Sequence, residues 1–206
     1  MAEQELILDF ISSLDGYGAA EGWPGLWGIE SPEYLAWLEQ TPDRDYTILM
    51  GANTYRLMSD FAAQAEQGKG NDTLTEEDAS FIELTQASKV VFSSTLQPPL
   101  SWANSRLISG DAVEAVREMK RTGDRPLRTL GSLTLCRSLL KAGLVDRLRV
   151  VVFPVINGSS GYDRIYDGYP DVALDMVASR TFDGKLQLLE YVPRVLAGPP
   201  GTQPGS

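Results

Sequence analysis

The stretch RTLGSLTLCRSLLKAGLVDRLRVVVFPVINGSSG, residues 128–161, decides the fold. A hydrophobic run ends just before Gly131 and Ser132, and these two residues stand at the start of a helix-like segment. Gly143 follows the last apolar residues of that segment, where glycine commonly ends a helix. The chain then returns as a second apolar run at residues 150–153. The stretch therefore predicts a strand, a helix and a second strand.

The same alternation of strands and helices extends through the rest of the chain. The expected strands are 6–11, 46–50, 89–92 and 106–108, and the expected helices are 32–40, 53–64, one from 75 and one from 111. A polar loop is expected at 65–74. Residues 173–180 and 186–192 alternate and flank Asp183-Gly184, which predicts an antiparallel hairpin. We therefore expect an α/β fold in which helices cover both faces of a mostly parallel central sheet and the C-terminal hairpin adds antiparallel strands.

The length and composition indicate one globular unit. At 206 residues the chain can bury one sizeable core, and we expect a single domain at 1–195 and a disordered tail at 196–206. No apolar run reaches the roughly 20 residues that cross a bilayer, and the acidic start is unlike a signal peptide. Cys136 is the only cysteine, which rules out an internal disulfide and fits a reducing compartment. We expect a cytoplasmic protein without a membrane partner.

The charged residues exclude several classes of function. The net charge of −10 argues against a nucleic-acid partner, because phosphate backbones require clustered Lys and Arg. The chain contains no histidine, so histidine-based triads, histidine-ligated zinc and the commonest general base are excluded. We predict no metal site. The chemical groups available for catalysis are carboxylates, hydroxyls, backbone amides and a bound cofactor. The expected partner is a small-molecule substrate.

Three expected strands end in glycine or serine where a helix or turn begins. These ends are Gly51, Ser93-Ser94 and Gly131-Ser132. Ligands of parallel sheets bind at the carboxyl ends of strands, and the N-terminus of a helix suits phosphate. The alternative is that glycine only permits the turn and serine only caps the helix. Neither the G-x-G-x-x-G fingerprint nor a P-loop motif is present.

The order of the motifs resembles the dihydrofolate reductase-like superfamily. The most similar branch is the reductase domain of bifunctional riboflavin-pathway enzymes and its stand-alone relatives. The resemblance covers about residues 6–192. Its motifs are SLDGY at 13–17, MGANTY at 50–55, VFSSTL at 91–96, GSL at 131–133 and PVING at 154–158.

The resemblance implies an NADPH-dependent reductase with the dihydrofolate reductase-like fold. The implied substrate is a small heterocyclic or sugar-linked compound of the pyrimidine or pterin type, as for 5-amino-6-(5-phosphoribosylamino)uracil reductase in riboflavin biosynthesis. A homodimer is also implied, with the apolar runs Val150–Phe153 and Leu186–Val192 near its interface. The implied cofactor contacts are Gly51 and Thr54 at the phosphates, Ser93, Ser94 and Thr95 at the adenosine 2′-phosphate, and Gly131, Ser132 and Leu133 at the pyrophosphate.

Four features depart from the family pattern. Ala52 stands where the family often has a phosphate-holding arginine, and Arg56, one helical turn further on, is the candidate substitute. Leu130 replaces the frequent first glycine of a Gly-Gly pair, and Arg147 stands where glutamate is frequent. The chain carries no zinc-deaminase signature, which the bifunctional enzymes have in their other half.

Several side chains have both a functional and a structural interpretation. Asp15 is the candidate catalytic residue, in contact with the substrate, and its alternative is an Asp-Gly turn that satisfies its own backbone. Trp23 and Trp27 either wall a planar substrate or form a minor core cluster. Glu33 is interpreted as a helix-start residue, and Cys136 as a core residue on the inner face of its helix.

Two functions from different classes follow from these observations. The leading hypothesis is an NADPH-dependent reductase, and hydride transfer suits a chain without histidine because the nicotinamide carries the difficult step. The alternative is a dinucleotide- or ligand-binding protein that keeps the reductase fold with little turnover, and Ala52 supports it. A third interpretation, a structural dimerisation module, leaves the glycine- and serine-rich strand ends unexplained.

Overall fold

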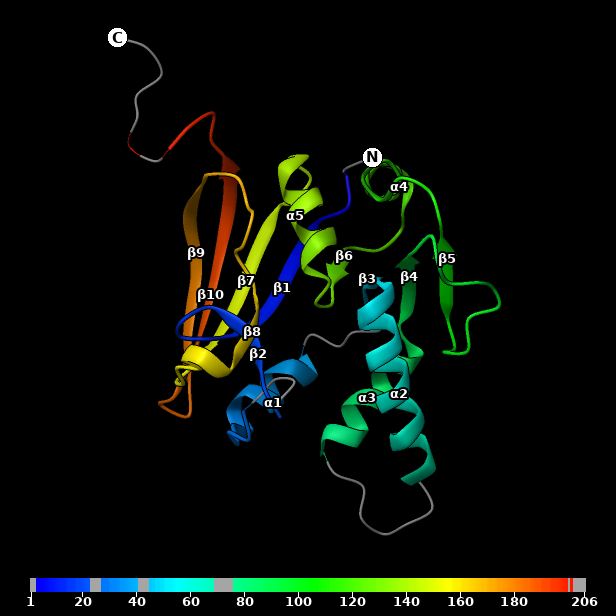
Figure 1. Cartoon of the computed structure of the whole chain (residues 1–206), viewed down its shortest axis with the longest axis horizontal. Coiled ribbons are helices and arrows are strands. Elements are labelled where there is room, and N and C mark those ends of the chain that lie inside the picture. The colour runs from blue at the N-terminus through cyan, green and yellow to red at the C-terminus, as the bar shows by residue number, and fades with distance from the viewer. Residues whose placement is uncertain (1–2, 23–26, 41–44, 69–75, 200, 202–206) are drawn as a thin grey trace. The chain divides into compact units, whose positions relative to one another are not determined.

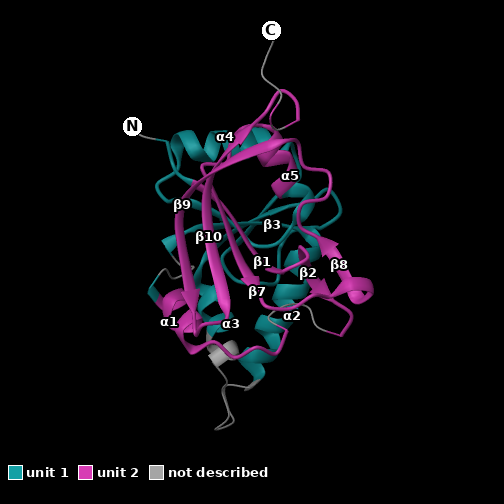
Figure 2. Ribbon diagram, turned by 90° about the vertical axis from the view of Figure 1, so that its left-hand side faces the viewer, with its two compact units in different colours: residues 1–5, 40–135 teal, residues 6–39, 136–206 magenta. Residues whose placement is uncertain are grey.

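A computed structural model describes residues 3–22, 27–40, 45–68, 76–199 and 201 (Figure 1). The chain forms two compact units, each built from two separate parts of the sequence (Figure 2). Unit 1 consists of residues 1–5 and 40–135, and unit 2 consists of residues 6–39 and 136–206. None of the helices in the described residues is both long and apolar enough to cross a membrane.

Unit 1 contains a sheet of four parallel strands in the order β5-β4-β3-β6. The strands are β3 (Thr47–Gly51), β4 (Ser88–Phe92), β5 (Ser105–Ile108) and β6 (Leu127–Thr129). The helices are α2 (Ala52–Gly68), α3 (Glu76–Gln86), α4 (Ala112–Thr122) and the first turn of α5 (Leu133–Lys141). The core includes Ile48, Met50, Val91 and Trp102, all nearly inaccessible to solvent. Strands of this kind are apolar throughout because both faces of a parallel sheet are covered.

The buried Lys89 completes the end of α3. Its ammonium group donates to the carbonyl oxygens of Leu84, Thr85 and Ala87 at 2.9, 3.1 and 2.7 Å. It also lies 4.6 Å from the ring centre of Trp102. The last carbonyls of a helix have no partner within the helix, so a cation satisfies them. Lys89 is therefore tolerated in the core because its ammonium group is fully paired with these carbonyl oxygens.

Unit 2 contains four hydrogen-bonded strands in the order β1-β7-β10-β9. The parallel pair is β1 (Leu6–Ser13) with β7 (Arg147–Phe153), and the antiparallel hairpin is β9 (Val172–Phe182) with β10 (Leu186–Val195). A separate two-stranded ribbon pairs β2 (Tyr17–Ala20) with β8 (Gly161–Arg164), which follows the short helix η2 (Gly158–Ser160). The remaining helix is α1 (Pro32–Gln40).

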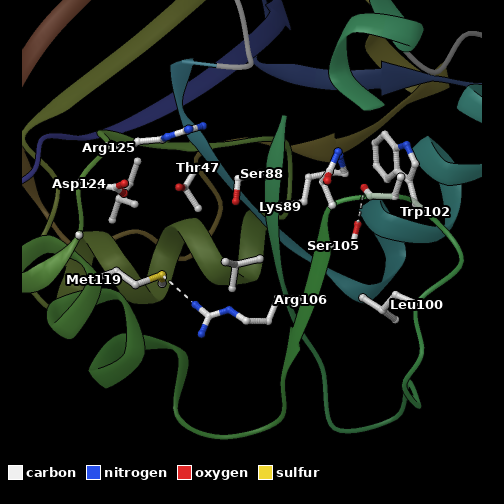
Figure 3. A pocket seen from close by; sticks show the side chains of 15 residues that line it. Thr47, Ser88, Lys89, Leu100, Trp102, Ser105, Arg106, Met119, Asp124 and Arg125 are labelled. Carbon is white, nitrogen blue, oxygen red and sulfur yellow. Dashed lines mark hydrogen bonds between the residues drawn. The ribbon is translucent and has the colours of Figure 1, made fainter. Parts of the chain in front are cut away.

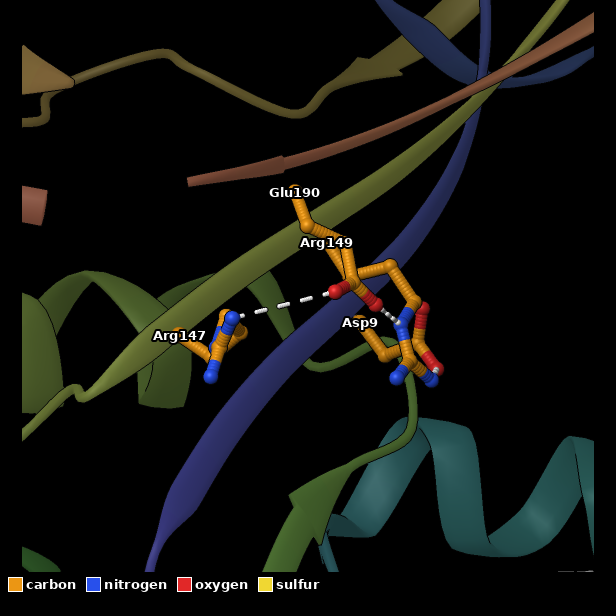
Figure 4. A network of polar contacts seen from close by, with 4 residues as sticks. All are labelled: Asp9, Arg147, Arg149 and Glu190. Atoms are coloured by element: carbon orange, nitrogen blue, oxygen red, sulfur yellow. Dashed lines mark hydrogen bonds and ion pairs between the residues drawn. The ribbon is translucent and has the colours of Figure 1, made fainter. Parts of the chain in front are cut away.

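A ladder of charges crosses the middle of the unit 2 sheet (Figure 4). Strand register places Asp9, Arg149 and Glu190 side by side on three neighbouring strands. The Arg149 side chain is 8% exposed, and it donates to Glu190 at 2.6 Å and to Asp9 at 3.4 Å. Arg147 lies 3.9 Å from the same glutamate, and Trp37 covers the Arg149 guanidinium. A buried arginine is strongly destabilising unless it is paired, so the two carboxylates keep it in the sheet.

The hairpin turn caps α1. The Asp183 carboxylate accepts from the Glu33 amide at 3.1 Å and from the Ser31 hydroxyl at 2.5 Å. In return, the Glu33 carboxylate accepts from the Asp183 amide at 2.7 Å. Asp183 and Gly184 have φ values of +47° and +63°, as a tight hairpin turn requires. Glu33 is therefore a helix-start residue, as the sequence predicts.

The predicted fold class is confirmed, as a mixed α/β fold with a mostly parallel sheet and a C-terminal antiparallel hairpin. One local expectation was wrong. Residues 65–68 continue α2 and are not part of the expected polar loop. The predicted cap at residue 75 and most of the predicted tail lie outside the described residues. Sequence periodicity missed β2 and β8 because their sequences, YGAA and GYDR, lack the alternation of apolar and polar residues that marks a strand.

Candidate functional site

The side chain of Ser132 joins two strand-to-helix junctions in unit 1. Its hydroxyl oxygen accepts a hydrogen bond from the Gly51 amide at 2.7 Å, where β3 ends and α2 begins. The same hydroxyl donates to the Thr54 hydroxyl at 2.9 Å. Ser132 itself lies between β6 and α5. Because β3 and β6 are parallel neighbours, these junctions share one edge of the sheet, and the hydroxyl ties them together.

The backbone at this junction is left-handed at two successive residues. Gly131 has φ +54° and Ser132 has φ +63°. A side chain at Gly131 would place its Cβ 3.3 Å from the Thr54 Oγ1 atom, which is tighter than ordinary contact. A left-handed serine costs about 1–3 kcal/mol, and this strain persists only where surrounding contacts hold the residue. The hydrogen bonds of Ser132 supply those contacts.

The arrangement brings together the N-termini of α2 and α5. The first turns of both helices lie within the described residues and carry no acidic side chain. Free backbone N–H groups and the helix dipole give each N-terminus a partial positive charge. The Gly51 amide already donates to Ser132. The donors for a bound anion would therefore be backbone amides in the first turns of α2 and α5. The site therefore suits an anion such as a phosphate group.

Residues 93–95 follow the neighbouring strand at the same edge. Gly51 pairs in register with Phe92, so this loop begins one residue beyond the end of β3. The Ser93 hydroxyl accepts from the amides of Thr95 and Leu96, both at 3.1 Å, and therefore shapes the turn. Ser94 and Thr95 are exposed at its surface. The loop adds exposed hydroxyls beside the junctions joined by Ser132.

Asp15 belongs to unit 2 and connects two loops there. One carboxylate oxygen accepts from the Ser13 hydroxyl at 2.6 Å and from the Asn157 amide at 3.2 Å. The other oxygen accepts from the Gly158 amide at 3.0 Å. These bonds hold the turn after β1 against the loop that leads into η2. They use three of about four acceptor positions, which leaves the second oxygen able to accept once more.

The same contacts determine the charge of Asp15. The Ser13 hydroxyl, followed by the backbone amide of Gly158, lowers the pKa of Asp15 from 3.8 to about 2. Hydrogen bonds to the ionised form of a carboxyl favour that form. Asp15 is therefore a carboxylate at neutral pH, and it can accept a hydrogen bond but does not donate a proton.

The structure groups some predicted site residues and separates others. Gly51, Thr54, Gly131 and Ser132 form one cluster in unit 1, and Leu133 begins the helix that follows it. The partners of Asp15 were missed by sequence reasoning. The Asn-Gly pair within the motif PVING was the available signal, since such pairs form turns with exposed amides.

The remaining candidates have structural roles within the described residues. Trp27 packs against Phe153 with ring centres 5.2 Å apart and joins the aromatic cluster under α1. Cys136 is fully buried in the core, as expected from its position on α5. Arg56 is exposed on α2, and its guanidinium donates to the Asn53 side chain at 3.2 Å. Trp23 lies outside the described residues.

The sequence matches the family model of the RibD C-terminal domain over residues 4–188. The chain belongs to this family. Within the curated proteins, the uncharacterized protein YyaP of Bacillus subtilis (strain 168) is 25% identical over 193 residues. The alignment covers 93% of this chain and 96% of YyaP, so the relationship extends over essentially the whole domain.

Solved structures identify the fold of this RibD-type domain. The Thermotoga maritima diaminohydroxyphosphoribosylaminopyrimidine deaminase/5-amino-6-(5-phosphoribosylamino)uracil reductase matches with a TM-score of 0.61 at 17% identity, over 93% of this chain and 57% of that one. Dihydrofolate reductase from Enterococcus faecalis, complexed with NADP(H), matches with a TM-score of 0.54 at 13% identity, over 93% and 98% of the two chains. The fold is dihydrofolate reductase-like. Family membership suggests a pyrimidine reductase-like function with a nicotinamide cofactor.

Proposed function

We propose that this protein is an NADPH-dependent reductase that transfers hydride to a small heterocyclic or sugar-linked substrate. The substrate class we favour is the pyrimidine type reduced in riboflavin biosynthesis, 5-amino-6-(5-phosphoribosylamino)uracil. The observation that carries the proposal is the bond from the Gly51 amide to Ser132, which unites two helix N-termini at one edge of a parallel sheet. We further propose that residues 1–195 act as one reductase domain and that the protein is cytoplasmic.

The residues at this edge fit the phosphates of a dinucleotide. Gly131 leaves open the space that a Cβ atom would fill beside Thr54, so an anion can approach the backbone closely. The first turns of α2 and α5 offer amide donors without a competing carboxylate. These local dipoles matter in a chain of net charge −10, because the overall field repels anions.

Each candidate residue has a role in this proposal. Gly51, Thr54, Gly131, Ser132 and Leu133 would shape the phosphate site. The hydroxyls of Ser93, Ser94 and Thr95 would face the 2′-phosphate. Asp15 would accept a hydrogen bond from a substrate N–H or hydroxyl and so orient the substrate. When bound, the cofactor would supply the hydride, which explains how a chain without histidine can catalyse a reduction.

A dinucleotide-binding protein with little turnover is the second candidate function. Ala52 favours it, because the family often has a phosphate-holding arginine at that position. Arg56 is exposed on the next turn of α2, where its guanidinium donates to the Asn53 side chain, and it is the candidate to replace that arginine. Titration of NADPH, followed by tryptophan fluorescence, tests both functions. Binding together with NADPH oxidation against a panel of pyrimidines supports the reductase, binding alone supports the second candidate, and absence of binding contradicts both.

Ser94→Asp should shift the cofactor preference from NADPH toward NADH. The new carboxylate would face the 2′-phosphate and repel it by about 1–3 kcal/mol, a five- to 150-fold change in relative affinity. The measurement is the ratio of the NADPH and NADH dissociation constants. Gln97→Glu adds the same charge at an exposed position of the same loop and should leave that ratio unchanged. An unchanged ratio in Ser94→Asp would show that Ser94 does not face the phosphate.

We also propose a homodimer, which would use the β9–β10 hairpin. The hairpin exposes Leu174, Met176 and Val195 by 38–57% each, strand register places these three on one face, and exposed apolar clusters commonly mark interfaces. The sequence-based expectation that Val150–Phe153 lies near the interface stays a prediction. Strand β7 lies between β1 and β10, and most of its apolar side chains are buried within unit 2.

Light scattering at micromolar concentration should therefore give twice the chain mass of 22.6 kDa. Met176→Lys should shift the protein to the monomer, because a charge would enter the apolar cluster. Tyr162→Lys changes an equally exposed residue on β8, outside the hairpin, and should remain dimeric. A wild-type protein that is monomeric would remove the dimer from the proposal.

A further inference from the structure

A cavity opens at the amino ends of the unit 1 strands, opposite the junctions joined by Ser132. Its volume is about 460 Å³. The first residue of each of the four parallel strands lines it, namely Thr47, Ser88, Ser105 and Leu127. The junctions joined by Ser132 lie at the last residues of the same strands. The cavity is therefore separate from the proposed cofactor site, and the proposed reductase function does not use it.

The charges around the cavity are opposite in sign to those of the whole protein. Arg106 of β5 and Arg125, just before β6, both line it, and Asp124 is the one carboxylate among the lining residues (Figure 3). Lys89 also lines the cavity, and its ammonium group is bonded to carbonyl oxygens at the end of α3. In a chain of net charge −10, this local excess of positive charge attracts anions.

Among the residues that the structure describes, the guanidinium of Arg106 keeps most of its donors available. It is directed toward Met119, and its Nη2 atom lies 3.8 Å from the sulfur (Figure 3). Sulfur is a weak acceptor, and a guanidinium has five N–H donors in a fixed plane that matches carboxylate and phosphate oxygens. The contact therefore orients the group without neutralising it. Hydroxyl groups of Thr47, Ser88 and Ser105 lie in the same wall and can add further donors.

The cavity lining also contains apolar side chains. Leu100, Trp102 and Met119 contribute to its lining, so a bound molecule would meet both an apolar surface and cationic groups. Pockets of this size that mix an apolar wall with a few polar groups are typical of small-molecule sites. A bare inorganic ion would leave the apolar part of the space unused.

We propose that this cavity binds a small organic anion, with a carboxylate or phosphate held by Arg106, the charge of Arg125 adding to the attraction, and an apolar body against the apolar part of the lining. Carboxylates and phosphate esters share the chemistry that a guanidinium group recognises, so the test uses one probe of each kind. The site is a second ligand site of the protein, at the amino ends of the strands.

The test is isothermal titration of the full-length protein with phenyl phosphate and with benzoate at low ionic strength. At least one probe should bind at one site, and its affinity should fall as salt is added. Arg106→Gln and Arg125→Gln should each weaken binding five- to twenty-fold. Arg121→Gln, an exposed arginine on α4 that does not line the cavity, is the matched control and should bind as the wild type does.

Gly131→Val separates this cavity from the proposed cofactor site. It should leave binding of the probe unchanged, since Gly131 lies at the other end of the strands. Circular dichroism of each variant checks folding, and Arg106→Gln alone suffices if Arg125→Gln does not fold. The proposal is overturned if neither probe binds, if Arg106→Gln binds like the wild type, or if Arg121→Gln loses as much affinity as Arg106→Gln. Loss of probe binding in Gly131→Val would also overturn it, because the probe would then occupy the phosphate site.

Discussion

Asp15→Asn is expected to lower kcat/KM by about 10- to 100-fold, the effect of losing a hydrogen bond to a charged group, while NADPH affinity stays close to that of the wild type. The asparagine keeps the shape and turn-forming ability of Asp15 but removes the charge. The second carboxylate oxygen, which accepts only from the Gly158 amide at 3.0 Å among the described residues, is the atom proposed to face the substrate. Its loss should therefore appear in turnover and not in cofactor binding.

The same carboxylate also connects two loops, so the experiment must distinguish a loop effect from a substrate effect. Ser13→Ala is the matched control, because it removes the 2.6 Å bond to Asp15 and leaves the carboxylate in place. We expect Ser13→Ala to lower the melting temperature while kcat/KM changes little. Cofactor affinity, turnover and melting temperature are measured on each preparation. Full activity in Asp15→Asn, with only a lower melting temperature, would make Asp15 a structural residue.

Gly131→Val is expected to weaken NADPH binding by about 10- to 100-fold. A hydrogen bond to a charged group contributes about 1.5–3 kcal/mol, and the valine methyl groups would stand where the phosphate must approach the backbone. The Cβ atom alone would lie 3.3 Å from the Thr54 hydroxyl. The dissociation constant for NADPH is the quantity to measure.

Gly131→Val also places a β-branched residue at φ +54°, so its effect on folding needs a control. Gly143 has φ +66°, and a Cβ atom there would meet nothing within 4 Å. Gly143→Val therefore carries a similar backbone strain of about 1–2 kcal/mol away from the site. Its stability should fall through backbone strain alone, without the added Thr54 contact of Gly131→Val, and its NADPH affinity should be normal. Normal affinity in Gly131→Val as well would refute the phosphate site at this junction.

Local patterns predicted most of the fold. The turn Asp183-Gly184 between two alternating strands was enough to predict the hairpin, because few other residues adopt the required left-handed backbone. Asp111 was predicted to start a helix, and its carboxylate accepts from the amides of Val113 and Glu114. Gly143 was predicted to end α5, and it is left-handed there. These signals are readable because their physical causes lie within a few residues.

The candidate site was predictable only in part. The glycines and serines at the strand ends indicated the edge of the sheet where Gly51, Thr54, Gly131 and Ser132 lie, because the carboxyl ends of parallel strands all lie at one edge. Their mutual contacts were not readable. Ser132 meets Gly51 across 81 residues and Thr54 across 78 residues, and nothing in either segment specifies the other.

By itself, then, the sequence determined the order of strands and helices, the hairpin, the family and the residues available for chemistry. The tertiary structure alone decided that Ser132 links two helix N-termini, that Asp15 accepts from Asn157 and Gly158, and that Arg149 lies between two carboxylates. The cavity lined by Arg106 and Arg125 is likewise visible only once the strands are in register. The physical reason is that turns, caps and strand patterns arise from short-range backbone geometry. A side-chain hydrogen bond or a shared cavity depends instead on the register and packing of segments far apart in the chain.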